Sequence, residues 1–242
     1  IKIISDLELF KIFASSQVKI IGISGSNGKS TTSSLVYHIL KICGKKAFLG
    51  GNIGKSPLVK EAFDAEFCVF EVSSFQLEIT DFIFDAGIIL NISSNHIKEH
   101  GGMEGYKMAK EKILKGEGFR LKASHISTFE VLKDGYSIIK GKFYKNGELV
   151  SAIPEFKNLP GDHNLANILF SIAICMDFVG LHLPEILEAV KSFGNLPHRI
   201  EFVLEKEGVK FINDSKATNA SACLTALKAF PKVPIFLIAG GR

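Results

Sequence analysis

The chain has 242 residues, 46% of them hydrophobic and 22% charged, which supplies a sizeable core and excludes a disordered chain. A net charge of +4, without a basic cluster, suits a phosphorylated ligand and argues against a nucleic-acid partner. No apolar run approaches the ~18 residues of a membrane span, so no membrane partner is expected. The four cysteines are widely spaced without a CxxC pair, which indicates reduced thiols in the cytoplasm and no zinc site.

Strand-like and helix-like segments alternate in the first half of the chain. Short, nearly continuous apolar runs indicate buried parallel strands at 18–23, 46–49, 67–72 and 86–92. Helical spacing of apolar residues predicts helices over 30–41 and 103–115. This order predicts an α/β fold with a doubly wound, mostly parallel sheet of the P-loop NTPase type.

The pattern changes in the second half. Strand-like runs on both sides of Asn146-Gly147 predict an added β-hairpin, followed by helices over 162–178 and 184–193. After Gly194 a new series begins, which predicts the first part of a second, Rossmann-like α/β domain. Its expected elements are strands at 200–204, 209–213 and 234–239 and a helix at 217–230. We therefore divide the chain into 1–195 and 196–242.

Both ends of the chain look cut. The sequence begins at Ile1 without an initiator methionine, and it ends at Arg242 directly after a strand-like run. We therefore expect a fragment of a longer protein.

The strongest motif is a glycine-rich turn between the first predicted strand and helix, and it runs from Gly22 to Thr31 as GISGSNGKST. Glycines let backbone N–H groups face phosphate oxygens, and the helix N-terminus adds a partial positive charge. Lys29 can reach the β- and γ-phosphates, and the Ser30 hydroxyl can ligate Mg²⁺. The motif departs from the strict P-loop pattern, because Ile23 stands at the first glycine position. The alternative is a plain strand-to-helix turn.

A carboxylate ends the predicted strand over 67–72. Ligands of an open parallel sheet gather at the carboxyl ends of its strands, where Glu71 lies. Glu71 could hold Mg²⁺ directly or through water. The alternative is a solvated acid at a strand end.

Seven stretches, taken together, resemble the Mur ligases, which are ATP-dependent amide ligases of peptidoglycan precursor synthesis. In chain order they are GSNGKSTT (25–32), GGNIGKSPL (50–58), EVSSFQLE (71–78), NHIKEHGGMEGYKMAKEKI (95–113), GDHNLAN (161–167), LPHRIE (196–201) and FINDSKATN (211–219). SSFQLE and NDSKATN are typical of the members that add D-glutamate. The resemblance implies three domains, of which this chain would hold the central ATP-binding domain and the start of the C-terminal amino-acid-binding domain.

The resemblance also implies a reaction in the bacterial cytoplasm. The carboxylate of UDP-N-acetylmuramoyl-L-alanine attacks the ATP γ-phosphoryl group, and the D-glutamate amine then displaces phosphate from the acyl phosphate. A monomer is expected, and the fragment should bind Mg²⁺-ATP without ligating. The alternatives are another Mur-type or folylpolyglutamate-type ligase, or a P-loop NTPase regulator that hydrolyses nucleotide to change partners.

Residue roles follow from the same resemblance. The phosphates would be held by Gly25, Asn27, Gly28, Lys29 and Thr31. Ser30 and Glu71 would hold a first Mg²⁺, with Asn52 nearby. His96 and a carbamylated Lys110 would hold a second Mg²⁺, although Asn95 replaces the usual acid before His96. Without the resemblance, Asn52 reads as a turn residue, His96 as structural and Lys110 as a solvated helix residue.

The remaining roles belong to the far side of the nucleotide. Adenine or ribose would be held by Asn164, Asn167, Arg199 and Asp214. Lys216 would reach the γ-phosphate, and Thr218 would lie near the incoming glutamate. The alternatives are helix capping for Asn164 and a surface lysine for Lys216. A hinge near 195–198 would bring Lys216 to Lys29 on domain closure.

Overall fold

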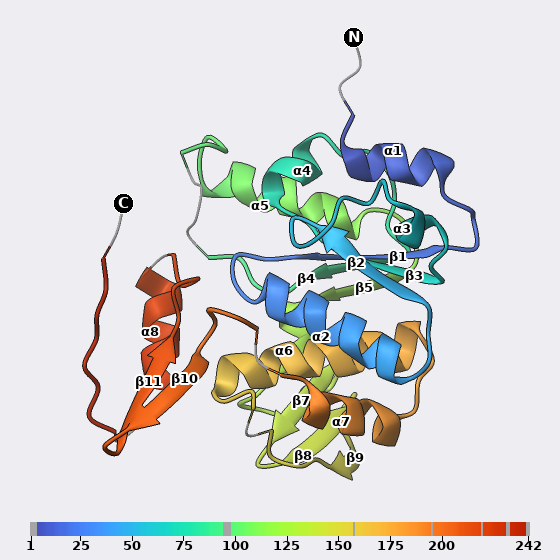
Figure 1. Cartoon of the computed structure of the whole chain (residues 1–242). Coiled ribbons are helices and arrows are strands. Elements are labelled where there is room, and N and C mark those ends of the chain that lie inside the picture. The colour runs from blue at the N-terminus through green and yellow to red at the C-terminus, as the bar shows by residue number, and fades with distance from the viewer. Residues whose placement is uncertain are drawn as a thin grey trace.

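The computed structural model describes residues 4–93, 98–156, 158–194, 196–218, 220–230 and 233–240. Its centre is a five-stranded, all-parallel sheet in the order β2-β3-β1-β4-β5 (Figure 1). The strands are β1 (Lys19–Ser24), β2 (Ala47–Gly51), β3 (Phe67–Glu71), β4 (Ala86–Ile89) and β5 (Phe119–Lys122). The chain builds one side of β1 and then crosses to the other, so the switch point lies at the carboxyl end of β1.

Helices cover both faces of this sheet (Figure 1). One face carries α2 (Lys29–Ile42), α6 (Asp162–Ala173) and α7 (Leu183–Ser192). The other carries α1 (Asp6–Phe13), α3 (Lys60–Phe63), α4 (Ser74–Glu78) and α5 (Met103–Glu111). The predicted doubly wound α/β architecture is confirmed.

Strand β1 shows why its run of apolar residues is nearly continuous. Successive side chains of a strand point to opposite faces, and both faces are covered here. Ile20 therefore packs into the core cluster under α1 and α4, whereas Ile21 and Ile23 pack into the cluster under α2 and α6.

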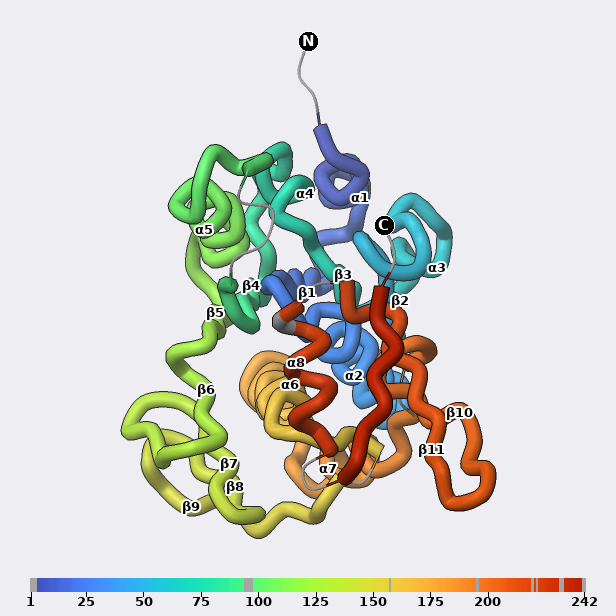
Figure 2. The backbone as a smooth tube through the Cα atoms, turned by 90° about the vertical axis from the view of Figure 1, so that its left-hand side faces the viewer, coloured from blue at the N-terminus to red at the C-terminus, as the bar shows by residue number. Residues whose placement is uncertain are grey.

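A four-stranded sheet lies beside α6 (Figure 2). It is formed by β6 (Ile126–Ser127), β7 (Tyr136–Ile139), β8 (Lys142–Lys145) and β9 (Glu148–Ala152). The predicted hairpin at Asn146-Gly147 joins β8 to β9, and both turn residues have positive φ. The Tyr136 hydroxyl and Lys145 Nζ both donate to Asp177, in the π-helical turn Ile174–Phe178 that continues α6. The predicted helix over 162–178 is therefore irregular in its last turn.

The chain after 196 forms the antiparallel hairpin β10 (Glu201–Lys206) and β11 (Val209–Asn213), followed by α8 (Ala220–Lys228). The predicted strand over 234–239 is wrong: this segment has no regular structure, and Phe236 is 95% exposed. A parallel strand is stabilised by neighbours on its edges, and among the described residues none pairs with this segment. Within the described residues, no helix combines the length and hydropathy needed to cross a membrane.

Candidate functional site

The glycine-rich turn lies at the switch point of the sheet. Strand β1 ends at Ser24 and α2 begins at Lys29, so residues 25–28 form the loop between them. Gly28 caps the helix with a φ of 84°, a left-handed conformation that side chains disfavour. A Cβ there would also lie 2.5 Å from Asn167 Oδ1, so any other residue would have to displace the Asn167 amide.

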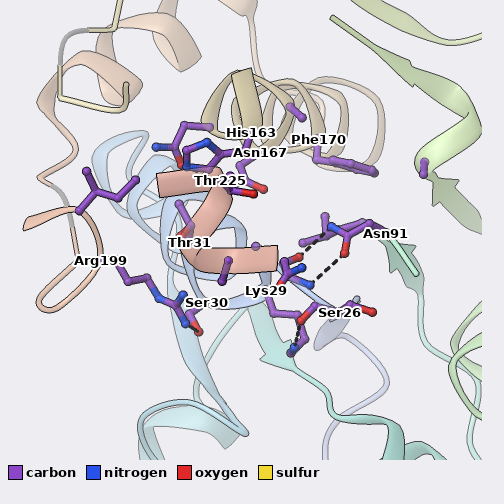
Figure 3. Close-up of a pocket in the computed structure, with 18 of the residues that line it drawn as sticks. Ser26, Lys29, Ser30, Thr31, Asn91, His163, Asn167, Phe170, Arg199 and Thr225 are labelled. Atoms are coloured by element: carbon purple, nitrogen blue, oxygen red, sulfur yellow. Dashed lines mark hydrogen bonds between the residues drawn. The ribbon is translucent and has the colours of Figure 1, made fainter. Parts of the chain in front are cut away.

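Two residues that follow β4 hold this loop in place. Asn91 makes a reciprocal pair with Asn27: its Oδ1 accepts from Asn27 N and its Nδ2 donates to Asn27 O, both at 2.9 Å (Figure 3). The backbone N–H of Ser93 donates to Ser26 Oγ at 2.9 Å. Sequence reasoning missed Asn91, although a polar residue directly after a buried strand was a usable signal.

Lys29 folds back over the loop. Its Nζ donates to the carbonyl oxygens of Gly25 at 2.9 Å and Ser26 at 3.1 Å. Burial lowers the pKa of Lys29, the Glu71 carboxylate opposes this, and the Arg199 guanidinium lowers the pKa further. A half-buried ammonium held mainly by neutral carbonyls favours an anion beside it.

Glu71 and Asn52 form the facing side of the site. Glu71 is only 3% exposed, and its Oε1 accepts from Asn52 Nδ2 at 2.9 Å. The other carboxylate oxygen, Oε2, is buried without a hydrogen-bond partner among the described residues. Because an unpaired buried carboxylate oxygen is costly, this position suits a bound cation. The structure thus places Asn52 against Glu71. Because Glu71 is buried, it is not the solvated strand-end acid of the alternative interpretation.

Lys110 also lies at the loop. It is 1% exposed, and its Nζ donates to Gly25 O at 3.0 Å and to Ser24 Oγ at 3.3 Å. Burial lowers the pKa of Lys110 to about 7; Lys29 contributes in the same direction, and Glu71 opposes it. Lys110 is therefore no solvated helix residue. Its predicted partner His96 lies outside the described residues.

The two asparagines of α6 are tied to protein groups. Asn164 Nδ2 donates to Pro160 O at 2.8 Å, but Asn164 is not the helix cap, because the N-cap of α6 is Gly161, which makes no side-chain capping hydrogen bond. Asn167 donates to Asn164 Oδ1 at 3.3 Å and accepts from the Thr32 hydroxyl at 3.2 Å. Both asparagines line the cleft described next, so α6 presents amide groups beside α2 (Figure 3).

The segment after 196 closes the other side of a cleft of about 1040 Å³. Arg199 Nη2 donates to Ser30 Oγ at 3.0 Å, so the residue directly after the predicted hinge contacts the first turn of α2. Asp214 Oδ1 accepts from Ile200 N at 3.1 Å, whereas Lys216 and Thr218 are exposed. The cleft brings together most of the predicted site: Asn27, Gly28, Lys29, Ser30, Thr31, Asn52, Glu71, Asn164, Asn167, Arg199, Asp214, Lys216 and Thr218.

The oxygen atoms available at the site favour a hard cation that is bound partly by the protein and partly by a phosphorylated substrate. In the part of the chain that the structure describes, no three His, Cys, Asp or Glu side chains gather as a metal cluster. Glu71 and the Ser30 hydroxyl are oxygen donors on the same cleft, next to the loop. Mg²⁺ is commonly bound in this way, by one or two protein oxygens plus the phosphates of a substrate. The fold and the site together define a nucleotide-binding α/β domain of the P-loop type.

Comparison with known proteins shows which family the chain resembles. The family model of the Mur ligase middle domain matches residues 23–126. UDP-N-acetylmuramoylalanine–D-glutamate ligase of Francisella philomiragia is 36% identical over 244 residues, which is 99% of this chain and 58% of that protein. The enzyme of the same name from Mesorhizobium japonicum is 36% identical and is covered to 57%. By this family model and these relatives the chain is similar to the Mur ligases over nearly its whole length, and it spans a little over half of these relatives.

Solved structures agree on the fold. MurF ligase from Thermotoga maritima, in complex with ADP, has a TM-score of 0.69 at 21% identity. That similarity covers 95% of this chain and 60% of the MurF chain.

Proposed function

We propose that this chain is the nucleotide-binding part of an ATP-dependent ligase that joins D-glutamate to UDP-N-acetylmuramoyl-L-alanine in peptidoglycan precursor synthesis. The observation that carries the proposal is the pairing of the loop at Lys29 with the unpartnered Glu71 oxygen on one cleft. The relatives at 36% identity support the choice of substrates.

The residues present fit a magnesium–nucleotide complex. Among the described residues, the half-buried Lys29 ammonium has no carboxylate as a hydrogen-bond partner, and the buried Glu71 Oε2 has no donor. ATP would supply the γ-phosphoryl group that activates the substrate carboxylate, and Mg²⁺ would offset the charge. Lys29 turns from the Gly25 and Ser26 carbonyls to the phosphates, while Ser30 and Glu71 hold the metal. Phosphoryl transfer needs little more than such positioning and charge neutralisation.

The remaining assignments keep their roles as parts of this proposal. Asn164, Asn167, Arg199 and Asp214 bind adenine or ribose, Lys216 reaches the γ-phosphate across the cleft, and Thr218 lies toward the glutamate. The Ser30 hydroxyl accepts a hydrogen bond from the Arg199 guanidinium in this structure. We expect Arg199 to move toward the nucleotide when Ser30 binds the metal, because the two cations repel each other. A second Mg²⁺ on His96 and a carbamylated Lys110 completes the proposal. The low pKa of Lys110 supports it, since only a neutral amine reacts with carbon dioxide.

The domain division is also a proposal. Residues 1–195 form the central domain, and 196–242 begin the domain that binds the amino acid. The core clusters, whose buried members run from Leu7 to Phe193, support this boundary. On this division the uridine site and most of the glutamate site are supplied by other parts of a longer protein. We therefore expect the 242-residue chain to bind Mg²⁺-ATP without forming an amide bond.

The experiment is a calorimetric titration of Mg²⁺-ATP into this chain and into Lys29→Ala. We expect binding to the parent chain and a loss of at least tenfold in affinity without Lys29, because charge-assisted hydrogen bonds to phosphate contribute about 1.5–3 kcal/mol. Lys41→Ala, at the far end of the same helix, is the control. Equal affinities for the parent chain and Lys29→Ala would contradict the loop assignment.

Two alternatives stay open. One is a ligase of the same kind with other substrates, of the Mur type or the folylpolyglutamate type. The other is a regulator that hydrolyses nucleotide to change partners. A substrate panel on the full-length enzyme separates the three. Phosphate release that depends on both the UDP-sugar carboxylate and D-glutamate supports the proposed ligase. Release stimulated by a protein partner alone supports the regulator.

A further inference from the structure

A second polar cluster lies between α4 and α5, and the proposed function does not account for it. Its centre is His100, whose side chain has no exposed area. His100 Nδ1 lies 2.7 Å from Glu78 Oε1, and Nε2 lies 2.9 Å from Ser74 Oγ. Because a carboxylate only accepts, Nδ1–H donates to Glu78, and the second ring nitrogen, Nε2, shares a hydrogen bond with the Ser74 hydroxyl.

Packing fixes the same histidine from both sides. The ring stacks on Phe75 at 4.8 Å between centroids and lies 5.3 Å from the ring of Tyr106. The backbone of α5 also approaches closely, since a Cβ on Gly105 would lie 2.0 Å from His100 O. His100 therefore joins α4 to α5 through its side chain and its backbone.

Both helices lead to the nucleotide site. α4 begins just after Glu71, with Ser73 as its N-cap in a capping box with Gln76. α5 carries Tyr106, whose hydroxyl lies 3.0 Å from Ser26 Oγ, and Lys110, whose Nζ donates to Gly25 O. His100 is thus a buried polar link between α4, which follows the strand end that presents Glu71, and α5, which contacts the loop.

We propose that His100 is a positioning residue of the nucleotide site, which acts by holding α5 against the loop at 25–28. The inference rests on the proposed function for its link to nucleotide binding. It also gives the SSFQLE stretch a physical role, because Ser74, Phe75 and Glu78 are the residues of that stretch that hold His100. His100 touches no reacting group in this assignment.

The test compares His100→Ala with two amide variants. His100→Asn can keep the donor toward Glu78, and His100→Gln can keep the contact with Ser74. Amide hydrogen exchange of residues 24–29 and 103–110 is measured beside the calorimetric Kd for Mg²⁺-ATP and the urea unfolding midpoint. His38→Ala is the matched control, because His38 Nε2 also bonds a serine, Ser192, but at the far end of α2.

We expect His100→Ala to speed exchange in both segments and to weaken Mg²⁺-ATP binding, each by about tenfold, as the loss of a buried hydrogen bond predicts. At least one amide variant should recover most of both losses, and His38→Ala should change neither. This pattern identifies positioning, because a general loss of stability would not be confined to these segments or be recovered by an amide.

Unchanged exchange at 24–29 in His100→Ala would overturn the proposal, and so would faster exchange with an unchanged Kd. If the parent chain does not bind Mg²⁺-ATP, the proposed function fails, whereas the exchange data still decide whether His100 holds α5 to the loop. If His100→Ala does not fold, Ser74→Ala removes one of the two bonds and takes its place in the same comparison.

Discussion

The first and last parts of the chain use apolar residues in opposite ways. In β1, Ile20, Ile21 and Ile23 are fully buried between two layers of helices. In the hairpin β10–β11, Phe202 is 58% exposed and Phe211 is 49% exposed. The first part therefore completes its core with its own helices, whereas the described elements after 196 leave their apolar residues uncovered. The two sides of the nucleotide cleft accordingly differ in how firmly they are held.

The largest predicted effect tests this difference directly. Ile21→Ala should lower the free energy of unfolding by about 2–5 kcal/mol, because it deletes fully buried methyl groups from the central strand and leaves a cavity. The matched substitution Ile212→Ala in β11, where the parent residue is 37% exposed, should cost less than about 1 kcal/mol. Urea unfolding of both variants checks the prediction. Equal losses would show that the hairpin is part of the same cooperative core.

The regular elements of the first part were predictable because burial on both faces leaves a strong local pattern. The runs at β1, β3 and β4 are apolar except at their ends, where Lys19, Ser24 and Glu71 lie, and α2 keeps a helical period. The strand expected at 234–239 was wrong because an apolar run does not say whether a partner strand lies beside it. α4 was missed because its five residues are too short for a period, although its capping box is readable in the sequence.

The site was predictable to the same extent. Lys29, Ser30 and Glu71 meet because a loop and a neighbouring strand end lie at one edge of a parallel sheet, which is a rule of topology. Other contacts of the site join segments that are far apart in the sequence, and these are the hydrogen bonds made by Lys110, Asn91 and His100. No local pattern encodes such contacts, so only the folded chain reveals them.

The second prediction concerns the pH dependence of stability, and it tests how firmly the first side of the cleft holds the buried Lys110. In the unfolded chain Lys110 has its ordinary pKa of 10.5, and burial lowers the folded value to about 7. Between these values the unfolded chain binds a proton that the folded chain does not, so stability rises with pH across this window. Below about pH 7 both states are protonated, and the full cost of the buried charge persists.

The measurement is the difference in unfolding free energy between the parent chain and Lys110→Met. From pH 7 to pH 9.5 the parent should gain about 3 kcal/mol relative to Lys110→Met, which has no amine to titrate. Lys107→Met, on the exposed side of α5, is the control and should show no such gain. In samples kept free of carbon dioxide, so that Lys110 stays a free amine, a pH-independent difference for Lys110→Met would mean that Lys110 is solvated and that α5 does not press it against the loop.

The smallest effect on stability is expected from removing residues 195–242. The buried members of both core clusters end at Phe193, and Leu196 is only a partly buried neighbour, so the loss should be about 1 kcal/mol or less. For a chain of this length that corresponds to a fall in Tm of about 2–4 °C. Mg²⁺-ATP affinity should fall much further, since Arg199 and Lys216 leave with the removed segment. A small loss of stability together with a large loss of affinity would mean that the residues before 195 fold on their own. The residues after 195 would then contribute to nucleotide binding but not to stability. A loss of several kcal/mol would instead make α8 and the residue after it, Ala229, which lies close to Gly161, a structural part of the first region of the chain.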